Sequence, residues 1–254
     1  MYSPKPPYTE PNQTTSSLIK NGFSLLAPKD FLSITQSTDS QWQELGQNWN
    51  TLPPDDYLKD GGRYRKRKHA SLIIQNEDSI EIAPPRPHWQ PISYNALHGG
   101  IDRWFKHCDQ DFLKAIPFQN LLQELSKLFY IAKNIQPYAS PWFVEVHQFR
   151  IDTKDGIGRP TPEGAHRDGV DFVAVLLMNR QFIKGGESRV FAIDGPNGLR
   201  FTLNESLSLL LLDDEKVIHE TTPIQPENPE LKDQAWRDTL VLTFRLYNFQ
   251  DKLN

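Results

Sequence analysis

Two histidines and an aspartate have the residue types and spacing of a metal-ligand set. His166-Arg167-Asp168 places an imidazole and a carboxylate one residue apart, and His219 follows further along the chain. Two imidazoles and one carboxylate can occupy one face of an octahedron and leave three adjacent positions open. This arrangement suits a non-haem Fe(II) centre that binds a bidentate co-substrate together with dioxygen. A closed structural zinc site is usually rich in thiolates, and the chain contains one cysteine.

The same His-x-Asp pattern occurs a second time, at His107, and the sequence context separates the two copies. The copy at His107 precedes a helix-like run whose N-cap we expect at Asp109 or Asp111. His166 instead follows a stretch rich in Gly and Pro and precedes a compact apolar run with strand character. A strand end can hold ligands rigidly. We therefore predict that His166 and Asp168 are ligands and that His107 is not.

The context of His219 predicts a hairpin. Residues 206–212 form an apolar run typical of a buried strand, 213–216 a polar turn, and 217–222 a returning strand. A histidine at the far end of such a hairpin can reach a ligand pair on a neighbouring strand. Alone, His219 would more readily be a core histidine; together with His166 and Asp168, we expect it to be the third ligand.

These residues lie in a run, from Pro160 to Arg245, that resembles the iron- and 2-oxoglutarate-dependent dioxygenases. More narrowly, it resembles the bacterial free L-amino-acid hydroxylases, such as isoleucine 4-hydroxylase and leucine hydroxylase. The segments that carry the resemblance are 162–172, 185–188, 217–221 and 237–245, with weaker similarity at 88–90, 94–95 and 146–150. It implies a centre of Fe(II) at His166, Asp168 and His219, with 2-oxoglutarate and O2 as co-substrates. The implied reaction hydroxylates or sulfoxidises a free aliphatic or thioether L-amino acid and releases succinate and CO2.

Arg237 and Thr239 are the predicted partners of the distal carboxylate of 2-oxoglutarate. A guanidinium fork matches the two carboxylate oxygens, and a nearby hydroxyl adds a further donor. Residues two apart on a strand point to the same side. Arg245 has the same parity but lies too far along the strand to serve the same carboxylate, so we favour Arg237.

A free amino acid also requires partners for its ammonium and its carboxylate, because a buried unpaired charge is costly. Asp171 and Glu163, near the metal motif, are the candidates for the ammonium; Arg150 and Arg63 are the candidates for the carboxylate.

A basic cluster at residues 63–69 stands out from an otherwise balanced sequence. We interpret it first as a solvated strand edge. Alternatively, Arg63 or Arg65 reaches into the pocket and holds a substrate carboxylate. Two other functions remain open: a 2-oxoglutarate-dependent hydroxylase of a peptide or protein side chain, for which an open basic groove at 63–68 would be expected, or a jelly-roll module that binds a metal or ligand without turnover.

The pattern of elements predicts a mainly β fold. Residues 101–134 are largely helical, with an apolar stripe, whereas from 141 onward the chain alternates between short strands and polar turns. Such a run is typical of a jelly roll, here a cupin-like double-stranded β-helix with flanking helices. We expect a mobile N-terminal tail over 1–17 and a single domain over 18–254, with additions at 18–140 and the jelly-roll core at about 141–250.

Composition limits the partners. The net charge of −4 over 254 residues gives no electrostatic footprint for nucleic acid or an anionic membrane. No signal-peptide pattern and no apolar run of membrane-spanning length is present, and Cys108 alone cannot form an intramolecular disulfide. We therefore expect a cytoplasmic enzyme with a small-molecule substrate, and the sequence is compatible with a homo-oligomer.

Overall fold

The computed structural model describes residues 5–77 and 79–252 and is built around antiparallel β-sheets. The large sheet has seven strands, in the spatial order β1 (Phe23–Leu26), β9 (Leu209–Asp213), β5 (Phe172–Gln181), β12 (Trp236–Leu246), β4 (Trp142–Asp152), β2 (Arg65–Asn76) and β3 (Ser79–Ile82). A three-stranded sheet contains β10 (Val217–Thr221), β7 (Glu187–Ala192) and β8 (Gly198–Thr202), and a two-stranded sheet pairs β11 (Ile224–Pro226) with β6 (Ile183–Gly185).

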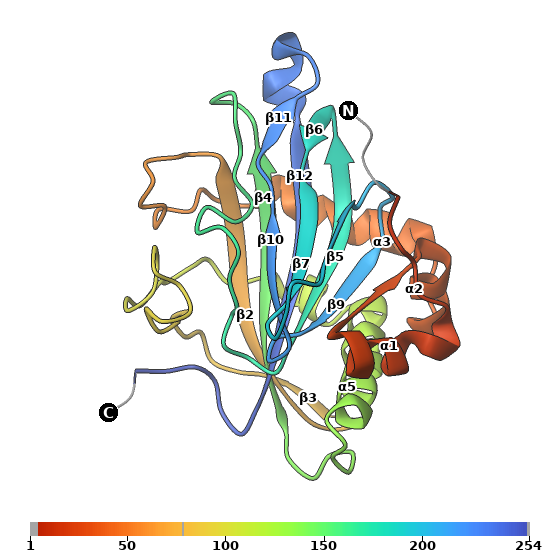
Figure 1. Ribbon diagram of the computed structural model, residues 1–254. Coiled ribbons are helices and arrows are strands. Elements are labelled where there is room, and N and C mark those ends of the chain that lie inside the picture. Colours follow the sequence, from red (N-terminus) through yellow and green to blue (C-terminus); the bar gives the residue numbers. More distant parts are fainter. Residues whose placement is uncertain (1–4, 78, 253–254) are drawn as a thin grey trace.

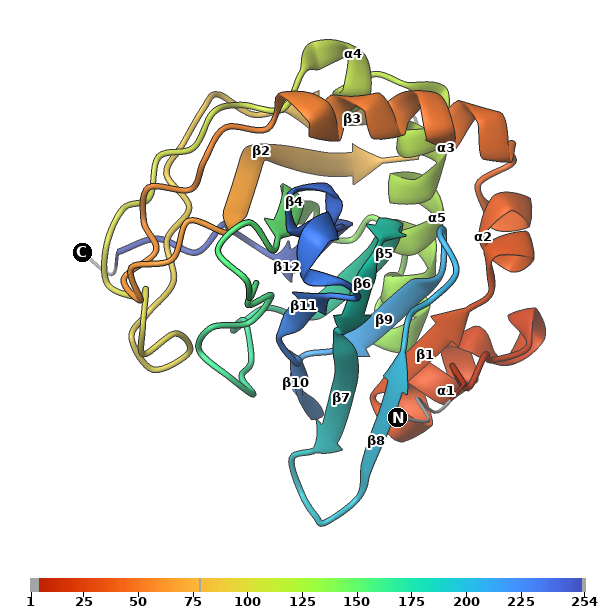
Figure 2. The same ribbon diagram turned by 90° about the horizontal axis from the view of Figure 1, so that it is seen from above.

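Alternation along β5 explains why the large sheet is buried on both faces. Phe172, Ala174 and Leu176 belong to the core that also contains helix α5 (Ile116–Ala132), whereas Val173 and Leu177 belong to the core shared with the three-stranded sheet. Successive side chains of a strand point to opposite faces, so one apolar run supplies both cores. The large sheet therefore has helices on one face and the smaller sheets on the other (Figures 1 and 2).

The helices cover one face of the large sheet (Figure 1). They are α1 (Thr14–Asn21), α2 (Pro28–Ile34), α3 (Asp39–Gly46), α4 (Gln110–Leu113) and α5 (Ile116–Ala132), with short 3-10 turns η1 (Pro11–Gln13), η2 (Gln47–Thr51) and η3 (Pro229–Gln234). In α5, four residues of the predicted apolar stripe are fully buried, as helical spacing predicts, and Leu128 packs half-buried beside them: Phe118, Leu121, Leu122 and Leu125. Thr38 and Gln41 form a capping box that fixes the start of α3.

Facing antiparallel sheets with helices outside form the double-stranded β-helix, or jelly roll, so the predicted fold class is confirmed. The predicted hairpin over 206–222 is wrong. Strand β9 pairs with β1 and β5 in the large sheet, whereas β10 pairs with β7 in the smaller one. The turn at 213–216 therefore carries the chain from one sheet to the other, a crossing that apolar alternation alone does not reveal.

The N-terminal segment also differs from its prediction. Residues 5–17 were expected to form a mobile tail, but η1 and the start of α1 lie there, and Thr14 is buried. Tyr8 Oη lies 2.7 Å from Ser208 Oγ, and the Thr9 amide donates to the Leu25 carbonyl. Residues 1–4 lie outside the described part of the chain. Among the described residues, no helix is long and apolar enough to cross a membrane.

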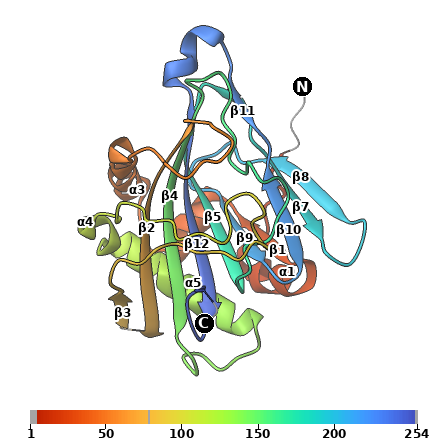
Figure 3. The same ribbon diagram turned by 90° about the vertical axis from the view of Figure 1, so that its left-hand side faces the viewer.

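A long connection from β3 to α4, residues 83–109, crosses over strands β2, β4 and β12 (Figure 3, yellow). One backbone bridge joins His88 and Arg103 within the connection. A second bridge joins His107 to His69 of β2. This connection has no regular period, yet it supplies one wall of the pocket described next.

Candidate active site

His166 and His219 are brought together by their own backbones. The His166 amide donates to the His219 carbonyl at 3.0 Å, and the His219 amide donates to the His166 carbonyl at 2.9 Å. Their ring centroids lie 4.7 Å apart. Asp168 completes the group: its Oδ1 is 3.8 Å from His166 Nε2, and its Oδ2 is 3.7 Å from His219 Nε2. One ligand atom from each residue lies within 4.8 Å of the others.

The loop that carries Asp168 is held by a second, fully buried aspartate. Asp214 Oδ1 accepts the amide of Asp168, and Oδ2 accepts the amides of Gly169 and Val170. Gly169 has φ +76°, and a Cβ there would lie 2.5 Å from the Tyr94 ring, so glycine is required. In the sequence, Asp214 stands in a polar turn, and no local pattern indicates this role.

Burial and neighbouring charges shift the pKa values of the two histidines in opposite directions. Burial lowers the pKa of His166, but Asp168 and Glu163 outweigh it, so the pKa lies above its ordinary value. Burial, and then His166, lower the pKa of His219 to about 4. The His166 ring uses Nδ1 to donate to the Gly164 carbonyl at 2.9 Å, which leaves Nε2 facing Asp168. Neutral imidazoles with a free Nε2 are the form that binds a metal.

The three side chains line a partly open pocket of about 120 Å3, between the sheets and the 83–109 connection. Arg237, Thr239, Val241 and Thr243 line it from alternate positions of β12, as strand parity predicts. Arg237 is 3% exposed, and its Nε and one terminal nitrogen have no hydrogen-bond partner. Burial, and then Arg180, lower the pKa of Arg237 to about 10. This guanidinium therefore has unused N–H donors that can bind an anion.

Arg245, the competing arginine, does not line this pocket. Its guanidinium donates to the side chain of Asn248 at 2.8 Å. The structure thus brings Arg237, and not Arg245, into the pocket that contains His166.

Of the four substrate candidates, one lines the pocket. Glu163 does, and its Oε2 is buried without a partner. Asp171 instead pairs with Lys133 at 2.6 Å and accepts the Leu246 amide. Arg150 makes a two-pronged ion pair with Asp238, outside the pocket, because its parity on β4 is opposite to that of the pocket-lining positions.

The burial of the basic cluster also differs from the solvated strand edge that we first expected. Arg63 is exposed and lies outside the pocket, but Arg65, Arg67 and Lys68 are buried, so 63–69 is not a solvated edge. Lys68 bonds to Asp109 and Thr51. Arg65 lines the pocket, as the alternative interpretation anticipated, and Arg67 lines it as well, which the sequence analysis did not predict.

Comparison with known proteins identifies the family. The model of the 2OG-Fe dioxygenase family matches residues 46–243, most of the chain. The chain belongs to the 2OG-Fe dioxygenase family. It is therefore a 2-oxoglutarate-dependent non-haem iron dioxygenase, which uses Fe(II), 2-oxoglutarate and O2.

Solved structures of other proteins have the same fold. A bsmA homologue from Methylobium petroleophilum PM1 is 42% identical over all of both chains, with a TM-score of 0.90. IDO from Bacillus thuringiensis is 21% identical over 94% of this chain and 100% of its own, with a TM-score of 0.74, and shares the fold. The Fe(II)/(alpha)ketoglutarate-dependent dioxygenase TqaL shares it at 17% identity, 94% and 91% coverage and a TM-score of 0.66. No curated protein matches the chain.

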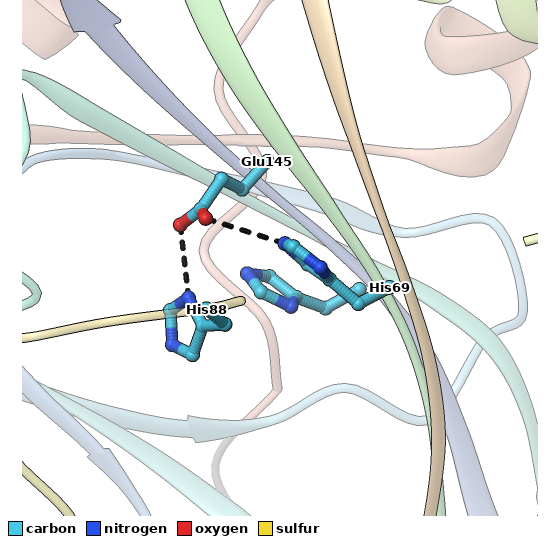
Figure 4. A group of neighbouring side chains, drawn as sticks. His69, His88 and Glu145 are labelled. Carbon is cyan, nitrogen blue, oxygen red and sulfur yellow. Dashed lines mark hydrogen bonds and ion pairs between the residues drawn. The ribbon is translucent and has the colours of Figure 1, made fainter. Parts of the chain in front are cut away.

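The dioxygenase contains a second group of possible ligands, which the sequence analysis did not combine. His69, His88, Glu145 and His147 are all buried, with ligand atoms within 4.8 Å of one another. Glu145 accepts from His69 Nε2 at 3.2 Å and from His88 Nδ1 at 2.9 Å (Figure 4). The weak similarity at 88–90 and 146–150 was the available signal for this group.

The hydrogen bonds that Glu145 and His147 already make disfavour metal binding at this second group. Arg86 also donates to Glu145, so both carboxylate oxygens already accept hydrogen bonds. Arg67 donates to His147 Nδ1 at 2.8 Å, which uses the lone pair of that nitrogen. Two guanidinium cations would also repel a divalent ion. Among the described residues, the first group is therefore the one that fits iron, with two imidazoles and a carboxylate facing one another and a pocket beside them.

The other copy of the His-x-Asp pattern, at His107, lies elsewhere in the dioxygenase. His107 Nδ1 interacts with the Cys108 carbonyl, and both residues line a separate hollow. Asp109 is the N-cap residue of α4 by position and pairs with Lys68 at 2.6 Å, although its side chain makes no capping bond.

Proposed function

We propose that this dioxygenase hydroxylates or sulfoxidises a small free L-amino acid, with Fe(II) held by His166, Asp168 and His219. When bound, the iron supplies the activation of dioxygen that is coupled to decarboxylation of 2-oxoglutarate to succinate and CO2. The protein supplies orientation: the exchanged backbone bonds fix the two histidines, and Asp214 fixes the loop that carries Asp168.

In this proposal, Arg237 and Thr239 bind the distal carboxylate of 2-oxoglutarate. The support is the buried guanidinium with unused donors, in the same pocket as the proposed ligands. A protein does not gain by burying such a cation unpaired unless a ligand completes it. Thr239 lies two residues along the same strand face and adds a hydroxyl.

The observation that carries the substrate class is the presence of buried, unpartnered groups of both charges in one pocket. Glu163 offers a carboxylate oxygen without a partner, and Arg67 and Arg103 each have an Nε without a partner. A zwitterion supplies the missing ammonium and the missing carboxylate together. An aliphatic or thioether side chain would face the remaining apolar lining, which includes Ile151 and Val175.

A peptide or protein substrate has less support. That function called for an open basic groove at 63–68, but Arg65, Arg67 and Lys68 are buried, and the 83–109 connection forms a wall of the pocket. A peptide would also lack the free ammonium and carboxylate that match the unpartnered groups.

The test is anaerobic reconstitution with Fe(II), followed by addition of O2, 2-oxoglutarate and each of the twenty amino acids in turn, with succinate as the readout. We expect aliphatic or thioether L-amino acids to stimulate succinate formation above the basal level, with an equal amount of oxidised amino acid. Stimulation by peptides and by none of the free amino acids would overturn the proposal.

A further inference from the structure

Three buried arginines line the active-site pocket apart from the proposed 2-oxoglutarate partner. Arg65, Arg67 and Arg103 are 5%, 2% and 2% exposed. Each has one N–H group that is buried and has no acceptor: one terminal nitrogen of Arg65, Nε of Arg67 and Nε of Arg103. Native proteins rarely leave a buried donor unpaired, and a guanidinium still less. Several such donors in one pocket indicate an absent acceptor.

Each of these arginines is held in place through another of its nitrogens. Arg65 Nε donates to Asp55 at 2.7 Å, and Arg67 lies 3.8 Å from the same carboxylate. Arg103 donates to Gln90 Oε1 at 2.9 Å. The guanidinium of Arg67 also lies 3.7 Å from the centre of the Phe105 ring, within range of a cation–π contact. These contacts restrict the rotamers, so the unpaired donors are preorganised.

The charge of this wall is not balanced. Asp55 is the carboxylate paired with Arg65 and Arg67, and Arg103 is bonded to the neutral amide of Gln90. Glu145 does not compensate, because it is 3.3 Å from Arg86 and bonded to two histidines. The nearby carboxylates are then Asp55 and Glu163, which lines the same pocket and acts on Arg103, so three cations outnumber two carboxylates and the pocket favours an added anion.

His147 extends the same wall. Arg67 can only donate, so His147 Nδ1 is the acceptor, and the neutral ring carries its proton on Nε2. His147 itself also lines the pocket. A carboxylate has two oxygens that accept about four hydrogen bonds, enough for the three unpaired guanidinium donors.

We propose that Arg65, Arg67 and Arg103 form a carboxylate subsite that binds the carboxylate of the substrate, separate from the Arg237 site for 2-oxoglutarate. This inference rests on the proposed function for the identity of the substrate, but the anion site itself does not. Gln90 connects the subsite to the metal centre: it accepts from Arg103 and donates to Asp168 Oδ1 at 3.0 Å. Binding at the subsite thus places the rest of the substrate beside the three proposed ligands.

The test uses propionate and propionamide, two probes of similar shape that differ in charge. The full chain is loaded with Mn(II) in place of Fe(II) and with saturating 2-oxoglutarate, which occupies Arg237. Thermal unfolding is followed at constant ionic strength while either probe is added. We expect propionate, and not propionamide, to raise the unfolding temperature in a saturable manner.

The variants are Arg67→Gln and Arg103→Gln, with Arg63→Gln as the matched control, because Arg63 is exposed and outside the pocket. Both pocket variants should weaken propionate binding by about tenfold or more, since each removes a charged hydrogen bond. The control should bind propionate as the wild type does. If Arg67→Gln does not fold, Arg67→Lys and Arg103→Gln decide the question, with retained 2-oxoglutarate binding as the check on folding.

Three results would overturn the subsite: equal effects of propionate and propionamide, unchanged propionate affinity in Arg67→Gln and Arg103→Gln, or propionate binding that is seen only in a parallel titration without 2-oxoglutarate. The last would assign the wall to the co-substrate. The outcome is independent of the amino-acid screen. Saturable propionate binding without turnover of any amino acid would overturn the proposed function and leave the subsite in place.

Discussion

His166 and His219 exchange both of their backbone hydrogen bonds, which makes them directly opposed residues of an antiparallel bridge. Their rings lie on neighbouring segments, with centroids 4.7 Å apart. The main chain therefore fixes the separation of the two imidazoles before any metal binds. A site preorganised in this way loses little entropy on binding an ion.

Replacement of either histidine should remove the metal site. We expect His166→Ala and His219→Ala to abolish both Fe(II) binding and turnover, because two protein ligands cannot hold the ion at this pocket against water. His107→Ala is the matched control and should keep both, since His107 lies in a different hollow. Metal content after dialysis, together with succinate formation, measures the effect. Loss of iron in His107→Ala and its retention in His166→Ala would reverse the assignment.

Arg237→Ala should raise the KM for 2-oxoglutarate and leave metal affinity unchanged. A buried ionic hydrogen bond contributes on the order of 2–3 kcal/mol, or roughly 30- to 150-fold. Thr239→Val should have a smaller effect, because it removes one neutral hydroxyl, and Arg245→Ala should have none. Steady-state kinetics with varied 2-oxoglutarate provides the comparison. An unchanged KM in Arg237→Ala would move the carboxylate contact elsewhere.

Asp214→Asn should weaken metal binding although Asp214 is not a proposed ligand. The amide has one acceptor oxygen where the carboxylate has two, so at least one of the three backbone N–H groups at 168–170 loses its partner. Loss of such a supporting contact typically reduces metal affinity by about 10- to 100-fold. Asp213→Asn, in the same turn, is the control, because its carboxylate bonds to Glu215 and Lys216 instead. Equal metal affinities in the two variants would refute the positioning role.

The buried histidine group should make the protein sensitive to acid. Burial lowers the pKa of His88 to about 3, although Glu145 opposes the shift. Its pKa in the folded state is below the ordinary 6.5, so the unfolded state binds more protons and stability falls as the pH drops below about 6.5. The loss approaches about 1.4 kcal/mol per pH unit for this group.

Denaturant unfolding of wild type and His88→Gln between pH 7 and pH 5 measures this contribution. The variant lacks the titrating ring, so its stability should depend less steeply on pH than that of the wild type. Identical pH slopes would mean that His88 is not buried in its neutral form.

The sequence predicted those parts of the site that depend on local rules. Strand parity correctly put Arg237 and Thr239 on one face, and the contrast in context separated His166 from His107. The jelly roll was also predictable, because short strands with polar turns leave few alternatives.

Other parts depend on contacts between distant segments, which have no local pattern. Arg103 and Gln90 reach the pocket from an irregular connection, and Asp214 bonds to a loop far from it in sequence. Proximity to the metal motif misled the choice of Asp171, whose partner Lys133 follows helix α5. Arg150 was misplaced because the face of β4 that lines the pocket could not be known before the sheet order.

The most direct test of the central claim compares a free amino acid with its capped forms. The iron-loaded enzyme is supplied with O2, 2-oxoglutarate and either the best free L-amino acid or its N-acetyl or amide derivative, and both succinate and the oxidised product are quantified. Each cap removes one charge and leaves a buried group such as Glu163 or Arg67 without its partner. We predict that both capped forms react far more slowly than the free amino acid. Comparable turnover of the capped and free forms would contradict the account and favour a peptide or protein substrate.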